Sequence, residues 1–125
     1  MKVTEVRPPR EFRVGLDGHI TLKDCARVTL EHDEQVTFVT PDGKEYDVAR
    51  KSWGFYATPS TNGRLRDFGW RSALVRSANG RHNVMLVDRA RQSEFDTYLR
   101  EESLKVVCWL DDDADLTIIG KAFGK

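Results

Sequence analysis

The sequence contains no long hydrophobic run. Its longest uninterrupted apolar segments are Val84–Val87 and Val106–Leu110, whereas a membrane-spanning helix needs about 20 consecutive apolar residues. Residues 1–9 are polar and proline-containing, so they lack the apolar stretch of a secretory signal. We therefore expect a cytoplasmic protein that does not associate with a membrane.

Cysteine is scarce, and neither sign of charge is in excess. The two cysteines, Cys25 and Cys108, lie far apart, and in a chain without a secretory signal we expect them to be buried, reduced thiols. Twenty basic residues balance 20 acidic residues. This balance excludes a molecule that binds nucleic acid or membranes through its overall charge, so any such binding must come from a local patch.

Familiar enzyme and cofactor motifs are also missing. The connection after Val87 has no glycine, which excludes the turn that binds a dinucleotide pyrophosphate. There is no glycine-rich lysine loop for nucleoside triphosphates, no serine in a G-x-S-x-G elbow, and no histidine pair spaced for a metal on one helix face. We expect no cofactor, although an enzyme built on scattered residues stays open.

The composition is that of a globular protein, and 125 residues suffice for one domain over residues 1–125. The arginine-flanked pair Pro8-Pro9 indicates an extended arm over residues 1–11. Residues 120–125 resemble a flexible tail. Between these ends the patterning predicts an α+β fold.

Short β-like segments separated by turns dominate residues 12–88. Four dipeptides supply the positive φ angles that tight hairpins need: Asp17-Gly18, Asp42-Gly43, Asn62-Gly63 and Asn79-Gly80. The flanking residues alternate between apolar and polar, as half-buried strands do. We therefore predict a mainly antiparallel sheet of hairpins.

The C-terminal third predicts a β-α-β unit. Val84–Val87 and Leu104–Leu110 are apolar at nearly every position, as in strands covered on both faces. Between them, Phe95, Tyr98 and Leu99 share one face of a helix predicted over residues 93–102, with Ser93 as its N-cap. Residues 116–119 predict a short final strand.

The segment from Arg50 to Arg71 concentrates two kinds of side chain. It holds five of the 12 aromatic residues and five basic residues against one aspartate, around a Pro-Ser-Thr-Asn-Gly turn. We interpret it as a binding hairpin in which aromatic rings stack on a ligand or partner while arginines grip phosphate. The predicted binding residues are Arg50, Lys51, Tyr56, Ser60, Asn62, Arg64, Arg66 and Arg71.

A structural interpretation of the same segment stays open. Trp53, Phe55, Phe68 and Trp70 are large enough to form the core of a sheet. The arginines would then be solvated or paired with the acidic run Asp111-Asp112-Asp113-Ala114-Asp115.

Two further groups of residues have the chemistry of sites. The acidic run follows a predicted strand, and its carboxylates suit Mg²⁺ or Ca²⁺, although the spacing matches no calcium loop. Three histidines and two cysteines suit zinc, but their spacing matches no known zinc motif: His19, His32, His82, Cys25 and Cys108. The acidic run is more simply explained as a solvated turn, and each of the three histidines adjoins a turn, where a polar side chain needs no metal.

The segment Trp53–Ser60 followed by Asn62–Leu65 resembles a pattern shared by a small group of uncharacterised bacterial proteins. Phe95, Tyr98-Leu99 and Trp109–Asp111 belong to the same pattern, so the resemblance extends over most of the chain. It implies a bacterial, cytoplasmic protein. It brings no functional residues with it, because no activity is attached to that group.

Three functional hypotheses follow. The first is a non-catalytic binding or accessory protein whose 50–71 hairpin holds a phosphorylated or sugar-bearing small molecule, or a protein partner. The second is a single-stranded nucleic-acid-binding protein that uses the same hairpin. The third is a small enzyme that uses Asp111–Asp115 and His82.

Overall fold

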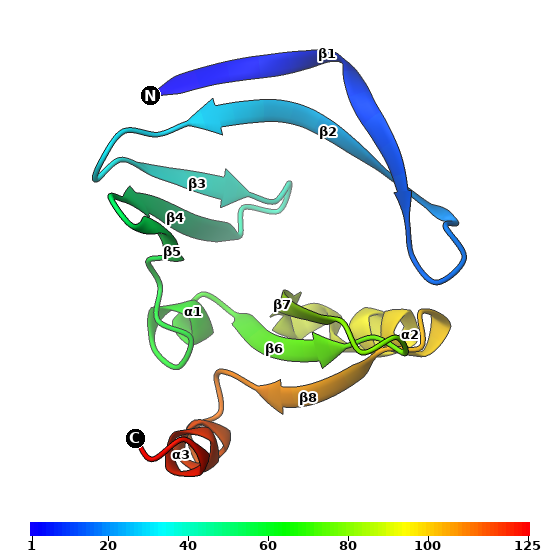
Figure 1. The fold of residues 1–125 in the computed structure, drawn as a ribbon, viewed down its shortest axis with the longest axis vertical. Coiled ribbons are helices and arrows are strands. Elements are labelled where there is room, and N and C mark those ends of the chain that lie inside the picture. Colours follow the sequence, from blue (N-terminus) through cyan, green and yellow to red (C-terminus); the bar gives the residue numbers. More distant parts are fainter. The chain divides into compact units, whose positions relative to one another are not determined.

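The computed structural model describes all residues from Met1 to Lys125 and has an α+β fold (Figure 1). The chain forms two compact units, which we call the N-unit (Met1–Thr58) and the C-unit (Pro59–Lys125). The prediction of a single domain over residues 1–125 stays a prediction. None of the helices has the length and apolar character needed to cross a membrane.

The N-unit begins with a two-stranded antiparallel ribbon. Strand β1 (Lys2–Val14) pairs with β2 (Ile20–Thr29), and the register shifts between Glu5 and Arg10. Pro8 and Pro9 lie in this gap, and proline has no N–H with which to continue a ladder. The segment predicted as an arm over residues 1–11 thus forms most of β1.

The second sheet of the N-unit has three antiparallel strands in the order β3-β4-β5. Strand β3 (Gln35–Val39) pairs with β4 (Glu45–Lys51), which pairs in turn with β5 (Gly54–Ala57). The buried residues of this sheet, Asp47 and Ala49, lie on the central strand β4. The buried Asp47 carboxylate accepts a hydrogen bond of 2.7 Å from the Thr37 hydroxyl.

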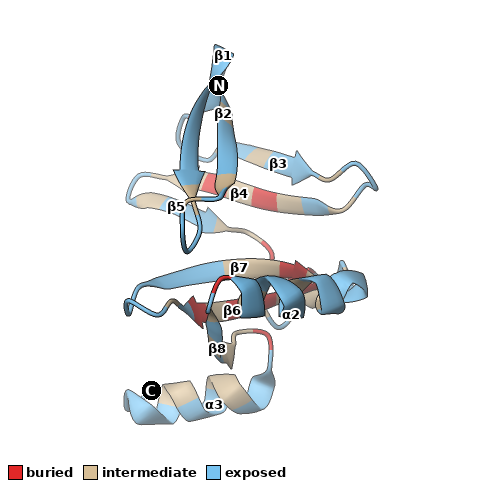
Figure 2. Cartoon of the chain, turned by 90° about the vertical axis from the view of Figure 1, so that its right-hand side faces the viewer, coloured by how far each residue is buried: buried red, intermediate tan, exposed pale blue.

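The C-unit is built around strand β6 (Trp70–Arg76), which follows the short helix α1 (Arg64–Asp67). It is the central strand of a sheet in the order β7-β6-β8, and it is antiparallel to both β7 (His82–Asp88) and β8 (Lys105–Trp109). The buried residues of this sheet lie on β6 and β7 (Figure 2), and α1 adds a further one. The core residues are Leu65, Trp70, Ala73, Val75 and Val87.

The predicted β-α-β unit is confirmed. Strands β7 and β8 are both antiparallel to β6 and therefore parallel to each other, and α2 (Gln92–Glu101) connects them after the 3₁₀ turn Arg89–Arg91. The Phe95 ring meets the Trp109 ring edge-on, with 6.2 Å between centroids, so the predicted apolar face of α2 packs on the sheet. Both outer strands are only partly covered, because Val84 and Val107 are exposed.

The predicted strand over residues 116–119 is wrong. These residues lie in helix α3 (Asp113–Ala122), which also includes the beginning of the predicted tail. Thr117, Ile118 and Ile119 favour strands by local propensity, but the carboxylate of Asp112 caps the helix by accepting the Asp115 N–H at 3.0 Å. The cap and the contact of α3 with β8 both favour the helix at these residues.

Three of the four predicted turns lie at hairpins. Gly18, Gly43 and Gly80 have φ angles of 73°, 90° and 83° in the β1–β2, β3–β4 and β6–β7 turns. The fourth dipeptide, Asn62-Gly63, instead precedes α1, and a Cβ on Gly63 would lie 2.3 Å from the Ser60 Oγ. Gly63 has a φ of −125°, so this glycine does not serve a hairpin turn, and a side chain here would require the Ser60 hydroxyl to rotate away.

The predicted hairpin over residues 50–71 does not form. Strand β5 pairs with β4 in the N-unit, whereas β6 pairs with β7 and β8 in the C-unit. Its two tryptophans differ accordingly: Trp70 is 9 % exposed and Trp53 is 69 % exposed. The core interpretation of the aromatics thus holds for Trp70 and fails for Trp53, Phe55 and Phe68, which are exposed.

Candidate functional site

The predicted binding residues divide between the two units. Arg50 and Lys51 end β4 and Tyr56 lies on β5, all in the N-unit. The other five belong to the C-unit, in the loop before α1, on α1 and on β6: Ser60, Asn62, Arg64, Arg66 and Arg71.

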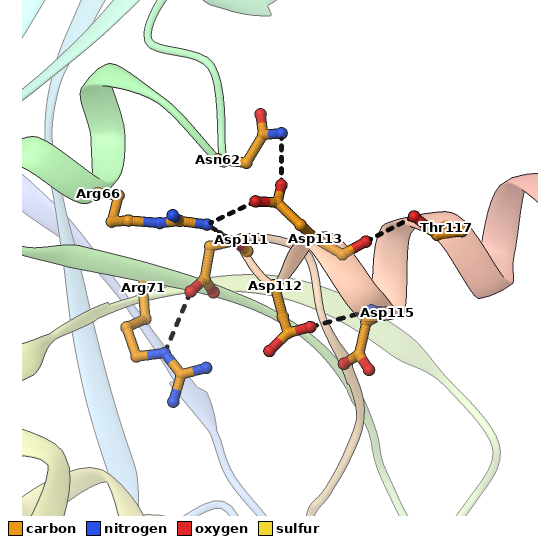
Figure 3. A network of polar contacts seen from close by, with 8 residues as sticks. All are labelled: Asn62, Arg66, Arg71, Asp111, Asp112, Asp113, Asp115 and Thr117. Carbon is orange, nitrogen blue, oxygen red and sulfur yellow. Dashed lines mark hydrogen bonds and ion pairs between the residues drawn. The ribbon is translucent and has the colours of Figure 1, made fainter.

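In the C-unit, the acidic run organises three of the predicted residues (Figure 3). The Asp113 carboxylate accepts a hydrogen bond of 3.0 Å from the Asn62 amide and lies 3.8 Å from an Arg66 nitrogen. Arg66 also donates to the backbone carbonyl of Asp111. These contacts join the loop and helix before β6 to the turn after β8, so Asn62 and Arg66 have structural partners.

Asp111 is buried at the centre of this network. One of its carboxylate oxygens accepts the Ser72 N–H at 3.1 Å, and the other lies 3.2 Å from Arg71 Nε. The Arg71 guanidinium also lies over the Trp109 ring, 3.7 Å from its centroid. The prediction that arginines pair with the acidic run therefore holds for Arg66 and Arg71.

The remaining carboxylates of the acidic run bond to backbone groups. Asp112 caps α3, and the Asp115 carboxylate accepts the Trp109 N–H at 3.1 Å. No three histidine, cysteine, aspartate or glutamate side chains come together in a way that could hold a metal ion. His82, the other residue of the enzyme hypothesis, begins β7 with its side chain exposed.

The two cysteines differ from the sequence-based expectation. Both are free thiols, but Cys25 is exposed and Cys108 is half-buried. Burial and the nearby Asp115 carboxylate raise the pKa of the Cys108 thiol. The prediction of two buried thiols is therefore wrong for Cys25, which lies on a two-stranded ribbon with no layer above it to bury every side chain.

A polar hollow of about 400 Å³ borders the acidic run. Its lining includes three arginines, Arg66, Arg71 and Arg89, and three carboxylates, those of Asp111–Asp113. Basic and acidic residues therefore border the hollow in equal number.

The N-unit carries an exposed group of aromatic residues around the β4–β5 turn. Trp53 and Phe55 are 69 % and 62 % exposed, and Tyr56 is 45 % exposed. The Trp53 and Tyr56 rings lie close together, with 5.9 Å between centroids and 31° between planes. We call Arg50, Trp53, Phe55 and Tyr56 together the Trp53 surface.

Arg50 supplies the unpaired charge of the Trp53 surface. It lies directly opposite Phe55 across the β4–β5 pair, so their side chains share one face of the sheet. Tyr56 and its partner Ala49 lie on the opposite face. The Arg50 guanidinium makes no hydrogen bond or ion pair within the chain, so its charge is available to a partner.

Lys51, by contrast, is neutralised. Its ammonium group donates to the Asp33 carboxylate. The other carboxylate oxygen of Asp33 lies 3.1 Å from the His32 Nε2. The hydrogen bond between the two side chains lowers the pKa of Asp33 and raises the pKa of Lys51. Of the two predicted cations on β4, only Arg50 therefore carries a charge without a partner.

A hollow of about 490 Å³ adjoins the Trp53 surface. Val28–Leu30 at the end of β2 form one part of its lining, and Arg50–Phe55 form the other. The predicted binding residues Arg50 and Lys51 thus meet Trp53 and Phe55, which the sequence did not assign to the site, and Leu30, which is buried. The β-like pattern of residues 28–30 gave no signal of this role, because the hollow depends on the pairing of distant segments.

Comparisons with protein-family models, curated proteins and solved structures find no match to this chain. The resemblance to small bacterial proteins therefore stays a prediction.

Proposed function

We propose that this protein is a non-catalytic binding protein that holds a protein partner on the Trp53 surface. The observation that carries this proposal is the exposure of Trp53 and Phe55 beside the unpaired Arg50. Large aromatic side chains are costly to leave in water, and exposed apolar surface rimmed by polar residues marks interaction sites. Tryptophan, tyrosine and arginine are also the residues that contribute most to binding at protein interfaces.

A protein partner fits this surface better than a small molecule. Trp53 lies in the turn, and Phe55 and Tyr56 point to opposite faces of β5. A small ligand in the adjacent hollow would leave Tyr56 uncovered, whereas a partner that wraps around the strand can cover all three rings. Small-molecule sites usually enclose most of the ligand surface.

Nucleic acid is the rival ligand, because the Trp53–Tyr56 ring pair suits base stacking. Binding to single strands also requires several cations along the backbone path. Lys51 is neutralised by Asp33, so the surface offers one unpaired cation. The charge of the surface therefore favours a protein.

The test uses three defined probes with the full chain: a phage-displayed library of random peptides, a set of nucleoside monophosphates, and an oligothymidylate. We expect the chain to enrich peptides and Trp53→Ser to abolish the enrichment. Phe123→Ser is the matched control, because Phe123 is also a highly exposed aromatic residue but lies in the C-unit. Binding of the oligothymidylate or a nucleotide, with no peptide enriched, would contradict the proposal.

A further inference from the structure

We infer that the partner binds as an extended segment of alternating acidic and apolar residues, which adds a strand to the open edge of β5. This inference rests on the proposed function and specifies the mode of binding. It depends on three observations: the outward direction of backbone N–H and C=O groups on β5, the alternation of side chains between the two faces of β5, and the unpaired guanidinium of Arg50.

The outer edge of β5 is open. β5 is the last strand of the β3-β4-β5 sheet, so no strand pairs with its outer edge. On its inner edge, the N–H of Thr58, just after β5, donates a hydrogen bond of 3.1 Å to the Asp47 carbonyl of β4. In an antiparallel pair, successive residues direct their N–H and C=O groups alternately toward and away from the partner strand. Gly54, Tyr56 and Thr58 therefore face β4, and Phe55 and Ala57 face outward.

The backbone N–H and C=O groups of Phe55 and Ala57 provide two hydrogen-bond donors and two acceptors on the outer edge of β5. No other strand pairs with them. An extended peptide laid along this edge satisfies all four groups, and backbone hydrogen bonds of this kind supply affinity in strand addition. Natural edge strands are protected by a charge, a proline or a covering element, or by being very short. β5 has four residues and contains neither a charge nor a proline.

The two faces of β5 select different side chains. Residues of an added strand alternate between faces, so one set lies beside Phe55 and the other beside Tyr56. The Phe55 face carries Arg50, whose guanidinium attracts a carboxylate. The Tyr56 face carries the Trp53–Tyr56 ring pair, which favours apolar side chains. The chemistry of the two faces thus specifies an alternation of acidic and apolar residues.

The experiment measures binding of a fluorescent octapeptide of alternating Glu and Val to the full chain by anisotropy. Two further octapeptides carry N-methyl groups on either the Glu or the Val residues. Because only one set of amides can face β5, we expect one N-methylated peptide to bind like the parent and the other to lose about tenfold or more in affinity. Equal binding of both would overturn strand addition.

Variants of the protein test the same contacts. We expect Ala57→Pro, which removes an outward N–H, and Arg50→Glu each to weaken binding of the parent peptide by about tenfold or more. Val39→Pro is the control for Ala57→Pro, because Val39 lies on the outer edge of β3, away from the hollow. If Ala57→Pro does not fold, the pair of N-methylated peptides decides.

The outcomes separate this inference from the proposed function. Peptide binding that depends on Trp53 but not on N-methylation retains the proposed function and refutes strand addition. Absence of any Trp53-dependent peptide binding refutes the proposed function itself. A dimer of the free chain that Ala57→Pro dissociates would show that a second copy occupies the β5 edge, and would overturn the inference.

Discussion

Asp111 and Arg71 form an ion pair in which the Asp111 side chain is buried and the Arg71 side chain is about three-quarters covered. Their atoms lie 3.2 Å apart, and the exposed fractions of the two side chains are 4 % and 26 %. The same carboxylate accepts the Ser72 N–H. A single acidic side chain thus links β6 to the turn that leads into α3.

We expect Asp111→Ala to destabilise the C-unit strongly. The change leaves the Ser72 N–H without its acceptor and Arg71 without its counter-charge, which should lower the free energy of unfolding by about 3 kcal/mol. Urea denaturation followed by tryptophan fluorescence measures the loss. Asp113→Ala is the control: Asp113 is largely exposed, and loss of its pairing should cost less than about 1 kcal/mol. Equal losses for both variants would contradict the central role of Asp111.

Asp112 should contribute to stability as a helix cap and not as a metal ligand. Replacing it with alanine removes the acceptor of the Asp115 N–H and should lower the free energy of unfolding by about 1 kcal/mol. Asp112→Asn retains the acceptor and should be nearly neutral. A comparable loss with asparagine would show that the charge, and not the cap, is required.

Truncation of the two tryptophans of the 50–71 segment should have very different effects on stability. Trp70 is buried in the C-unit core, so Trp70→Ala should cost about 3–5 kcal/mol of stability. Trp53 is exposed, and Trp53→Ala should change stability by less than about 0.5 kcal/mol. Acrylamide quenching checks the same difference, since loss of Trp53 should remove most of the readily quenched emission.

The thiols should differ in reactivity. Cys25 is exposed, whereas Cys108 is half-buried and its pKa is raised, so less of it is thiolate at a given pH. We expect iodoacetamide to modify Cys25 first under native conditions, with the site identified by mass spectrometry. In Cys25→Ser, only Cys108 can react, and it should react slowly. Because the pKa of Cys108 is raised above the ordinary thiol value of 9.0, the rate should continue to increase above pH 9. Fast labelling of Cys25→Ser would contradict this order.

The hydrogen bond between Lys51 and Asp33 should be detectable as a lowered pKa of the Asp33 carboxyl in an acid titration. The hydrogen bond from Lys51 lowers the pKa of Asp33 below 3.8. The carboxylate therefore favours the folded state above pH 3.8, and this contribution is lost as the pH falls through the lowered pKa. Carbon-detected NMR of the Asp33 carboxyl measures the midpoint. In Lys51→Gln it should move up toward 3.8, whereas Lys51→Arg should keep it low.

Local patterns in the sequence determined the α+β fold and most of its elements. The turn glycines required positive φ angles, so the three hairpins followed from single dipeptides. The face of Phe95, Tyr98 and Leu99 predicted α2, because helical periodicity can be read within one segment. The sequence allowed the arginines of the 50–71 segment either to bind a ligand or to pair with the acidic run. It shows that both charged groups are present, but it does not show the distance between them in the fold.

Only the tertiary structure decided which strands pair and which side chains are buried. Trp53 and Trp70 occupy similar local sequence contexts, yet strand pairing places one on a turn and the other in a core. Similarly, residues 116–119 have strand-forming side chains, but the Asp112 cap and the contact with β8 make them helical. Burial depends on residues that are distant in sequence, and no local pattern specifies them. For the same reason, the Trp53 surface emerged only when β5 paired with β4 and left its other edge open.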